Sequence, residues 1–175
     1  MLEPAQLYRD ELKKALISCW YNPRYKYYFG SGRYEHELAN NTDWKQEFVQ
    51  LDDNGKVVGY FGYNYNDCNK ALTNFGLIGF TENNFKLVRA ALCRVAYLFF
   101  HGAQRAEFWC YADNPIKPWY DSIVTRYGGK QIATLHRTDW FDGEYHDMCV
   151  YEILVEDFQK AAVNLPPSIL LEIFT

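Results

Sequence analysis

The segment from residue 105 to residue 133 reads as a strand, a helix and a second strand in direct succession. An apolar run ends at residues 113–115, Asp-Asn-Pro, and Gly128-Gly129 precedes the next apolar run. Behind the proline, large apolar side chains recur every four positions: Trp119, Ile123 and Tyr127. Proline is tolerated in the first turn of a helix, so the helix is predicted to begin there. An amphipathic helix between two strands must cover a sheet, which makes an α/β arrangement the first expectation.

Length and charge narrow the class of protein. The 175 residues suit one domain, expected over residues 1–175. A net charge of -4 and a pI near 5.6 disfavour the basic field that nucleic-acid binding needs. Five scattered cysteines without a CxxC pair favour reduced thiols, and no apolar run reaches membrane-spanning length. We therefore expect a cytoplasmic protein with no membrane partner.

Hydrophobic periodicity predicts the remaining elements. The predicted order is a helix (4–19), strands (from 44, 56–65 and 71–80), a helix (83–101), a strand (106–112), the helix behind Pro115, strands (130–137 and 146–155) and a short helix. This order predicts an α+β fold with a mixed, mostly antiparallel central sheet flanked by helices. Because crossovers are right-handed, strand 106–112 should lie parallel beside strand 71–80. The apolar tail, residues 169–174, is expected to dock on the body or in a homodimer.

Two long segments carry a resemblance to a known family. They are "RVAYLFFHGAQRAEFWCYADNP", which begins at Arg94, and "YGGKQIATLHRTDWFDGEYHDMCVYEILVEDF", which begins at Tyr127. In order and spacing they resemble the GNAT superfamily of acetyl-CoA-dependent N-acetyltransferases, especially the branch that acetylates ribosomal-protein N-termini and small amines. The resemblance implies that the two parallel strands splay apart and that the pantetheine arm of acetyl-CoA enters the gap like an extra strand.

The resemblance also implies two residues at the reacting end of this gap. Asn114 would bridge the cofactor arm and the next helix; on the residues alone, Asp-Asn-Pro is equally a helix cap with a first-turn proline. Tyr120 would donate a proton to the departing thiolate of coenzyme A. Its spacing to the glycine pair is about one helical turn longer than the family's, so Tyr127 is the second candidate. Either tyrosine could instead be a core residue.

The cofactor's phosphates are expected at the start of the helix predicted from residue 83. Family members place Arg or Gln and two spaced glycines there, whereas this chain reads "GFTENNFKLV". Asparagine adopts positive φ more readily than other non-glycine residues, so a phosphate-binding loop is retained as an expectation. The residues assigned to cofactor binding, besides Asn114, are Ile78, Gly79, Phe80, Asn83, Asn84, Phe85 and Lys86. A backbone N–H around Gly79 and Phe80 would bind the oxyanion.

The acceptor side is less defined. Glu82 and Asp67 are candidate bases for the amine, and the aromatic and basic segment 21–34, with Arg24, Lys26 and Arg33, would flank the acceptor. The same mixture permits base stacking, although packing over a small core is favoured. A cluster of acidic and histidine side chains shows no zinc-ligand spacing, so no metal is expected; its members are His136, Asp139, Asp142, Glu144, His146 and Asp147.

The function expected is therefore an N-acetyltransferase that moves the acetyl group of acetyl-CoA to an amine of unknown identity by direct attack. The degenerate pyrophosphate loop leaves an alternative, a non-catalytic GNAT-like domain that binds a ligand or a protein. A third reading is a binder of single-stranded nucleic acid or of a phosphate ligand through segment 21–34.

Overall fold

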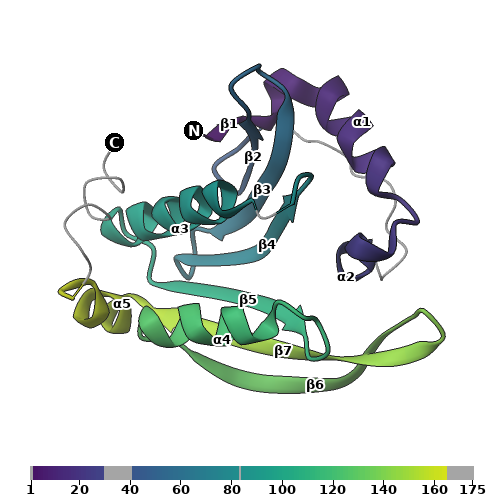
Figure 1. Ribbon diagram of the computed structural model, residues 1–175. Helices are drawn as coiled ribbons and strands as arrows, with labels where there is room; N and C mark the ends of the chain where they lie inside the picture. Colours follow the sequence, from purple (N-terminus) through teal and green to yellow (C-terminus); the bar gives the residue numbers. More distant parts are fainter. Residues whose placement is uncertain (1, 30–40, 83, 165–175) are drawn as a thin grey trace. The chain divides into compact units, whose positions relative to one another are not determined.

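The computed structural model describes residues 2–29, 41–82 and 84–164 (Figure 1). The expectations for Asn83, for residues 30–34 and for the tail 169–174 lie outside these residues. Seven strands form one hydrogen-bonded order, β1-β2-β3-β4-β5-β7-β6. The pair β4–β5 is parallel, and β1–β2, β2–β3, β5–β7 and β6–β7 are antiparallel. The predicted mixed, mostly antiparallel sheet with helices is confirmed.

The chain packs as two compact units. The first comprises Met1–Tyr65 and Asn74–Ala91, and the second Asn66–Thr73 and Leu92–Thr175. The expectation of a single domain over residues 1–175 stays a prediction. Three elements continue from one unit into the other: β3 (Val57–Asn66) in its last residue, β4 (Ala71–Gly79) and α3 (Phe85–Phe100).

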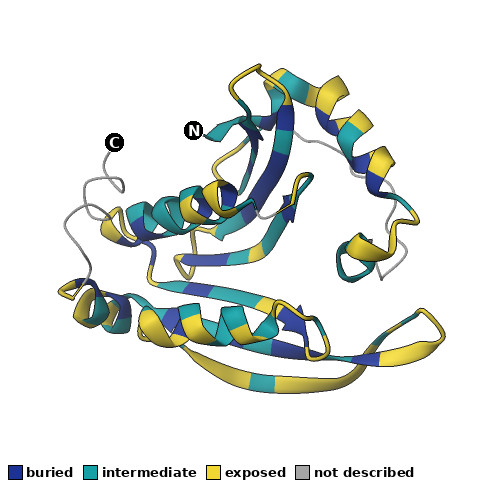
Figure 2. Cartoon of the chain, viewed as in Figure 1, coloured by how far each residue is buried: buried dark blue, intermediate teal, exposed yellow. Residues whose placement is uncertain are grey.

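The first unit packs helices onto the strands of its sheet. It holds β1 (Leu2–Pro4), η1 (Ala5–Tyr8), α1 (Arg9–Cys19), η2 (Pro23–Tyr25), α2 (Lys26–Phe29), β2 (Lys45–Leu51) and β3 (Val57–Asn66). The central strand β3 is buried along most of its length, as its apolar residues on both faces predict (Figure 2). The buried core contains Ala5, Leu12, Leu16, Cys19, Val49, Val57, Tyr60 and Ile78. Trp20 packs against it, as do Tyr25 and Tyr28 of segment 21–34, whereas Tyr21 of the same segment is 84% exposed.

The second unit is built on a long hairpin. It holds β5 (Arg105–Tyr111), α4 (Lys117–Arg126), β6 (Lys130–Phe141), β7 (Glu144–Leu154) and α5 (Val155–Ala162). Cys110, Val124, Cys149 and Tyr151 form its buried cluster, with Phe108 and Tyr120 packed against it. The outer strand β6 is mostly exposed, whereas β7 alternates towards the core (Figure 2).

Three boundaries differ from the predictions. Residues 2–4 form β1, which pairs with β2, so the first helix begins with η1 rather than at Pro4. The strands of the hairpin extend to Phe141 and from Glu144, whereas they were expected to end at residue 137 and to begin at residue 146, so the turn has two residues. Charged residues are tolerated there because β6 faces solvent. The helix α4 begins at Lys117, with Pro118 rather than Pro115 in its first turn.

The hairpin contains a bulge near His136 that could not be recognised in the polar sequence there. The register between β6 and β7 shifts between Leu135 and Asp139, and Arg137 has φ of 52°. The carboxylate of Asp147 accepts from the Arg137 N–H at 2.9 Å and lies 2.7 Å from His136 Nδ1. The Arg137 N–H and then His136 lower the pKa of Asp147. An ionised side chain therefore replaces the missing strand hydrogen bonds.

Among the described residues, no helix combines the length and the apolar character that crossing a bilayer requires.

Candidate active site

The parallel pairing between β4 and β5 is short. On one side all of β5 pairs with β7, in register from Arg105↔Leu154 to Tyr111↔Met148. On the other side the parallel register with β4 comprises two pairs, Ala71↔Arg105 and Leu72↔Ala106. Among the described strands, residues 107–111 have no parallel register partner on this side. Main-chain groups of a strand edge can bind an extended ligand through hydrogen bonds.

Tyr120 lies in the first half of α4 and packs on the cluster of the second unit. The centroid of its ring is 5.7 Å from that of Phe108 and 6.3 Å from that of Tyr151. Burial, and secondly the neighbouring Cys110, raise the pKa of Tyr120 to about 12. The phenol therefore keeps its proton at neutral pH, which an acid must do before it can donate.

Cys110 belongs to the buried cluster against which Tyr120 packs, so its pKa indicates how burial there affects a thiol. Burial is the largest cause that raises the pKa of Cys110 to about 11. A thiol in water has a pKa of about 8.5, so in water a phenol of pKa 12 would be a poor proton donor to a thiolate. Burial raises the pKa of a thiol as well as that of a phenol, which narrows the difference between donor and acceptor.

Tyr127, the second candidate, ends α4. Its ring stacks 6.1 Å from that of Phe158 in α5, and Phe158 also contacts Phe99 and Phe100. Seven residues separate the two tyrosines, which places them on one helix face about 10 Å apart along the axis. Tyr120 is thus the one that contacts β5 through Phe108.

Asn114 lies in the turn between β5 and α4. Its side-chain oxygen accepts from the Ile116 N–H at 3.1 Å, and its carbonyl accepts from the Lys117 N–H at 2.8 Å. The capping interpretation is therefore realised as an Asx turn before the helix rather than as the cap itself. This bond uses the oxygen, and the side-chain amide group is a donor that suits a ligand carbonyl.

The end of β4 belongs to the first unit. Ile78 is in the core of that unit, so its main chain rather than its side chain is available to a cofactor. The Phe80 N–H donates to the Val58 carbonyl at 2.9 Å and is already used within the sheet. A Cβ on Gly79 would lie 3.2 Å from that of Asn84, so the strand end and the start of α3 are in close contact.

Asn84 fixes the start of α3. Its side-chain oxygen accepts from the Leu87 N–H at 3.2 Å, as a helix N-cap does, and its amide donates to the Val58 carbonyl at 3.0 Å. The next two residues are exposed, Phe85 to 68% and Lys86 as well. Phe85 and Lys86 therefore present an aromatic ring and a positive charge beside a helix N-terminus, where anions are stabilised.

We predict that Asn84→Ala lowers the free energy of unfolding by about 1–2 kcal/mol, because one cap hydrogen bond and one bridge to β3 are lost. Urea unfolding measures the change. Asn54→Ala, in the exposed turn before β3, is the matched control and should stay within about 0.5 kcal/mol of the wild type. Equal effects of the two variants would contradict the capping role.

Arg24 is a basic residue whose partner the sequence did not reveal. Its guanidinium donates to the Thr81 carbonyl at 3.0 Å and lies 3.6 Å from the Glu82 carboxylate. Arg24 thereby offsets the negative charge that Glu82 would otherwise present near a phosphate. Neither base candidate is buried: Glu82 is 85% exposed and ion-paired, and Asp67 is 65% exposed and paired with Lys70.

A buried carboxylate on β2 was not among the sequence candidates. Glu47 is 1% exposed, accepts from the Tyr60 hydroxyl at 2.8 Å and lies 3.3 Å from Lys45 Nζ. Burial, and then Glu47, raise the pKa of Tyr28, so this phenol also stays protonated. The alternation Lys45, Glu47, Val49 was the available signal, because Glu47 shares its strand face with a core valine.

The histidine and acidic cluster divides into separate groups. His136 pairs with Asp147 at the bulge, and the Tyr111 hydroxyl donates to Asp139 at 2.7 Å. His146 lies 2.9 Å from Asp113, a residue outside the expected set, and Glu144 lies close to both. The expectation that no metal binds at these side chains stays a prediction.

This chain is similar to known proteins in its structure rather than in its sequence. No family model and no curated protein sequence matches the chain. A probable GNAT-family acetyltransferase from Chromobacterium violaceum aligns with 15% identity and a TM-score of 0.65, over 90% of this chain and 84% of that one.

Two further solved structures agree. Spermidine N-acetyltransferase from Vibrio cholerae, in complex with CoA and spermine, aligns with 14% identity and a TM-score of 0.63, over 91% of this chain and 97% of that one. A GCN5-related N-acetyltransferase from Brucella melitensis aligns with 19% identity and a TM-score of 0.60, over 99% and 90%. With its parallel β4–β5 pair inside an otherwise antiparallel order, this chain has the GNAT fold.

Proposed function

We propose that this chain is an N-acetyltransferase that transfers the acetyl group of acetyl-CoA to an amine. The observation that carries the proposal is the short parallel register of β4 and β5, beside which Tyr120 holds a protonated phenol. The GNAT fold supports it, since its structural neighbours are acetyltransferases, one of them in complex with CoA. Fold alone does not fix function, so the argument depends on the site.

In this proposal the pantetheine arm lies along β5. Main-chain groups of residues 107–111 bind its amides, and the side-chain amide of Asn114 binds beyond the strand end. The phosphates lie at the start of α3, near Lys86 and the exposed ring of Phe85. Ile78, Gly79, Phe80 and Asn84 contribute main chain and the shape of the loop, and Asn83, which lies outside the described residues, is assigned to cofactor binding from the sequence alone.

The transfer is a direct attack. The neutral amine nitrogen forms a bond to the thioester carbonyl carbon, and the C–S bond then breaks. The thiolate leaves as it receives the proton of Tyr120, while the amine's excess proton passes to a base or to water. Since the Phe80 N–H is used in the sheet, a neighbouring N–H, that of Gly79, is the oxyanion donor we propose.

The acceptor is proposed as a primary amine. Because structural neighbours include a spermidine N-acetyltransferase in complex with spermine, spermidine and spermine are the first acceptors to test, followed by peptides with free N-termini. A homodimer and a cytoplasmic location remain proposals of the same kind.

Thermal unfolding with acetyl-CoA tests cofactor binding. A ligand that binds the native state at a hundred times its Kd adds about 2.7 kcal/mol of stability, so the unfolding temperature should rise clearly. Dephospho-CoA is the matched ligand for the phosphate contacts and should give a smaller rise. No shift with millimolar acetyl-CoA would overturn the proposal. A shift without acetylation of any tested amine would instead support the non-catalytic alternative.

A further inference from the structure

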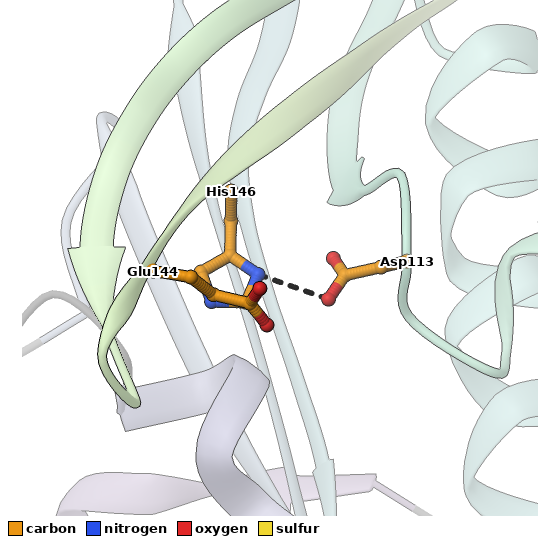
Figure 3. A group of neighbouring side chains, drawn as sticks. All are labelled: Asp113, Glu144 and His146. Atoms are coloured by element: carbon orange, nitrogen blue, oxygen red, sulfur yellow. Dashed lines mark hydrogen bonds and ion pairs between the residues drawn. The ribbon is translucent and has the colours of Figure 1, made fainter.

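Three side chains with metal-binding atoms converge at the end of β5 and the start of β7 (Figure 3). Glu144 and His146 are two residues apart on a strand and so point to the same face. The Ala112 N–H donates to the Asp147 carbonyl at 2.9 Å, which continues the β5–β7 register by one step. The next residue, Asp113, therefore lies opposite His146. Glu144 and His146 are therefore placed by β7, and Asp113 by the turn that directly follows β5.

The ring of His146 is held rigidly. Its side chain is 1% exposed, and it stacks on Phe141 with ring centroids 3.7 Å apart and an angle of 9°. Nε2 lies 3.1 Å from the Phe141 carbonyl oxygen. A carbonyl only accepts hydrogen bonds, so Nε2 carries the proton. A ring nitrogen that donates to a main-chain carbonyl is the arrangement that orients histidines towards metals.

The other ring nitrogen faces the carboxylates. Nδ1 lies 2.9 Å from Asp113 Oδ2, and the ligand atoms of Asp113, Glu144 and His146 lie within 4.8 Å of one another. With Nε2 donating to the main chain, Nδ1 is the ring atom that faces both carboxylates. Two carboxylates with one imidazole carry the charge that stabilises a divalent cation.

We propose that Asp113, Glu144 and His146 form a Zn²⁺ site. Imidazole nitrogen and carboxylate oxygen are both ordinary zinc ligands, and three protein ligands leave a fourth position for water. The exposed side chain of Glu144 rotates to close the site around the ion.

A bound ion would join two segments of the second unit. Asp113 precedes Asn114 in the β5–α4 turn, and Glu144 follows the β6–β7 turn. Zinc is therefore expected to stabilise the turn that carries Asn114, without touching the reacting groups. This site is independent of the proposed acetyl transfer, and its failure would leave that proposal intact.

Calorimetric titration of the full chain, freed of metal by chelation, with ZnCl₂ tests the site. One zinc per chain should bind, and Co²⁺ in its place should give visible d–d absorption of a low-symmetry site. Glu144→Gln should weaken zinc binding at least tenfold without loss of fold, because Glu144 is exposed. Asp142→Asn, which removes one charge from the same turn, should bind like the wild type.

Cys68 is an exposed thiol, so the titration is done in a Cys68→Ser background to exclude zinc bound there. Asp113→Asn is the second ligand variant, since substitution of the buried His146 risks misfolding. Absence of a stoichiometric zinc complex would overturn the proposal. Equal zinc affinity in Glu144→Gln, Asp113→Asn and Asp142→Asn would do so as well.

Discussion

Tyr120→Phe is expected to lower kcat for acetyl transfer by about a hundredfold or more, the range in which a positioned general acid contributes. Phenylalanine keeps the ring contacts with Phe108 and Tyr151 and removes only the hydroxyl. The KM for acetyl-CoA and the unfolding temperature should therefore change little. The release of coenzyme A thiol, followed at saturating acetyl-CoA and amine, measures the effect.

Tyr127→Phe is the matched control, because it makes the same change on the same face of α4. Its ring stacks on Phe158 rather than on the β5 side, so acetyl transfer should keep nearly the wild-type kcat. The reverse result, a loss confined to Tyr127→Phe, would move the proton donor to Tyr127. Wild-type kcat in both variants would remove a tyrosine acid from the mechanism.

The fold was predictable wherever one period dominated the sequence. The helix α3 and the apolar strand β3 form where their patterns predict them, and the crossover rule places β5 parallel to β4. In α3 the buried residues are Leu87, Ala91, Ala96 and Phe99, whereas Phe85, which begins the predicted apolar stripe, is 68% exposed. The errors arose where side chains replace main-chain hydrogen bonds. The Asp147 carboxylate accepts from the Arg137 N–H at the bulge of β6, and the strand continues to Phe141 instead of ending at residue 137 as predicted.

The site was less predictable because its geometry depends on contacts distant in the chain. Asn84 was expected to bind phosphate, which stays a prediction, and both ends of its side-chain amide bond within the protein, to the Val58 carbonyl and the Leu87 N–H. Nothing near Arg24 in sequence indicated that it would neutralise Glu82. Glu47 was overlooked because a lone charge on a strand usually faces water, whereas its partners Tyr60 and Lys45 make burial tolerable.

The largest effect on stability is expected at Gly128, which joins α4 to β6. Its φ of +79° disfavours any side chain, and a Cβ there would lie 2.5 Å from the Asp157 carbonyl oxygen in α5. The obstacle is main chain, so a side-chain rotation cannot relieve it. Gly128→Ala should therefore cost about 3 kcal/mol or more, from positive φ at about 1–2 kcal/mol and overpacking at about 1–3 kcal/mol.

A substitution at Gly143 distinguishes the cost of positive φ from the cost of overpacking. Its φ of +83° is nearly that of Gly128, but a Cβ there would meet nothing within 4 Å. Gly143→Ala carries the backbone cost alone, about 1 kcal/mol. Urea unfolding should therefore give free energies of unfolding for the two variants that differ by about 2 kcal/mol or more, provided that their m-values are equal. This difference is the cost of the clash with α5. Equal losses would mean that α5 moves away at no cost, and that its contact with the α4–β6 connection contributes little to the stability of the second unit.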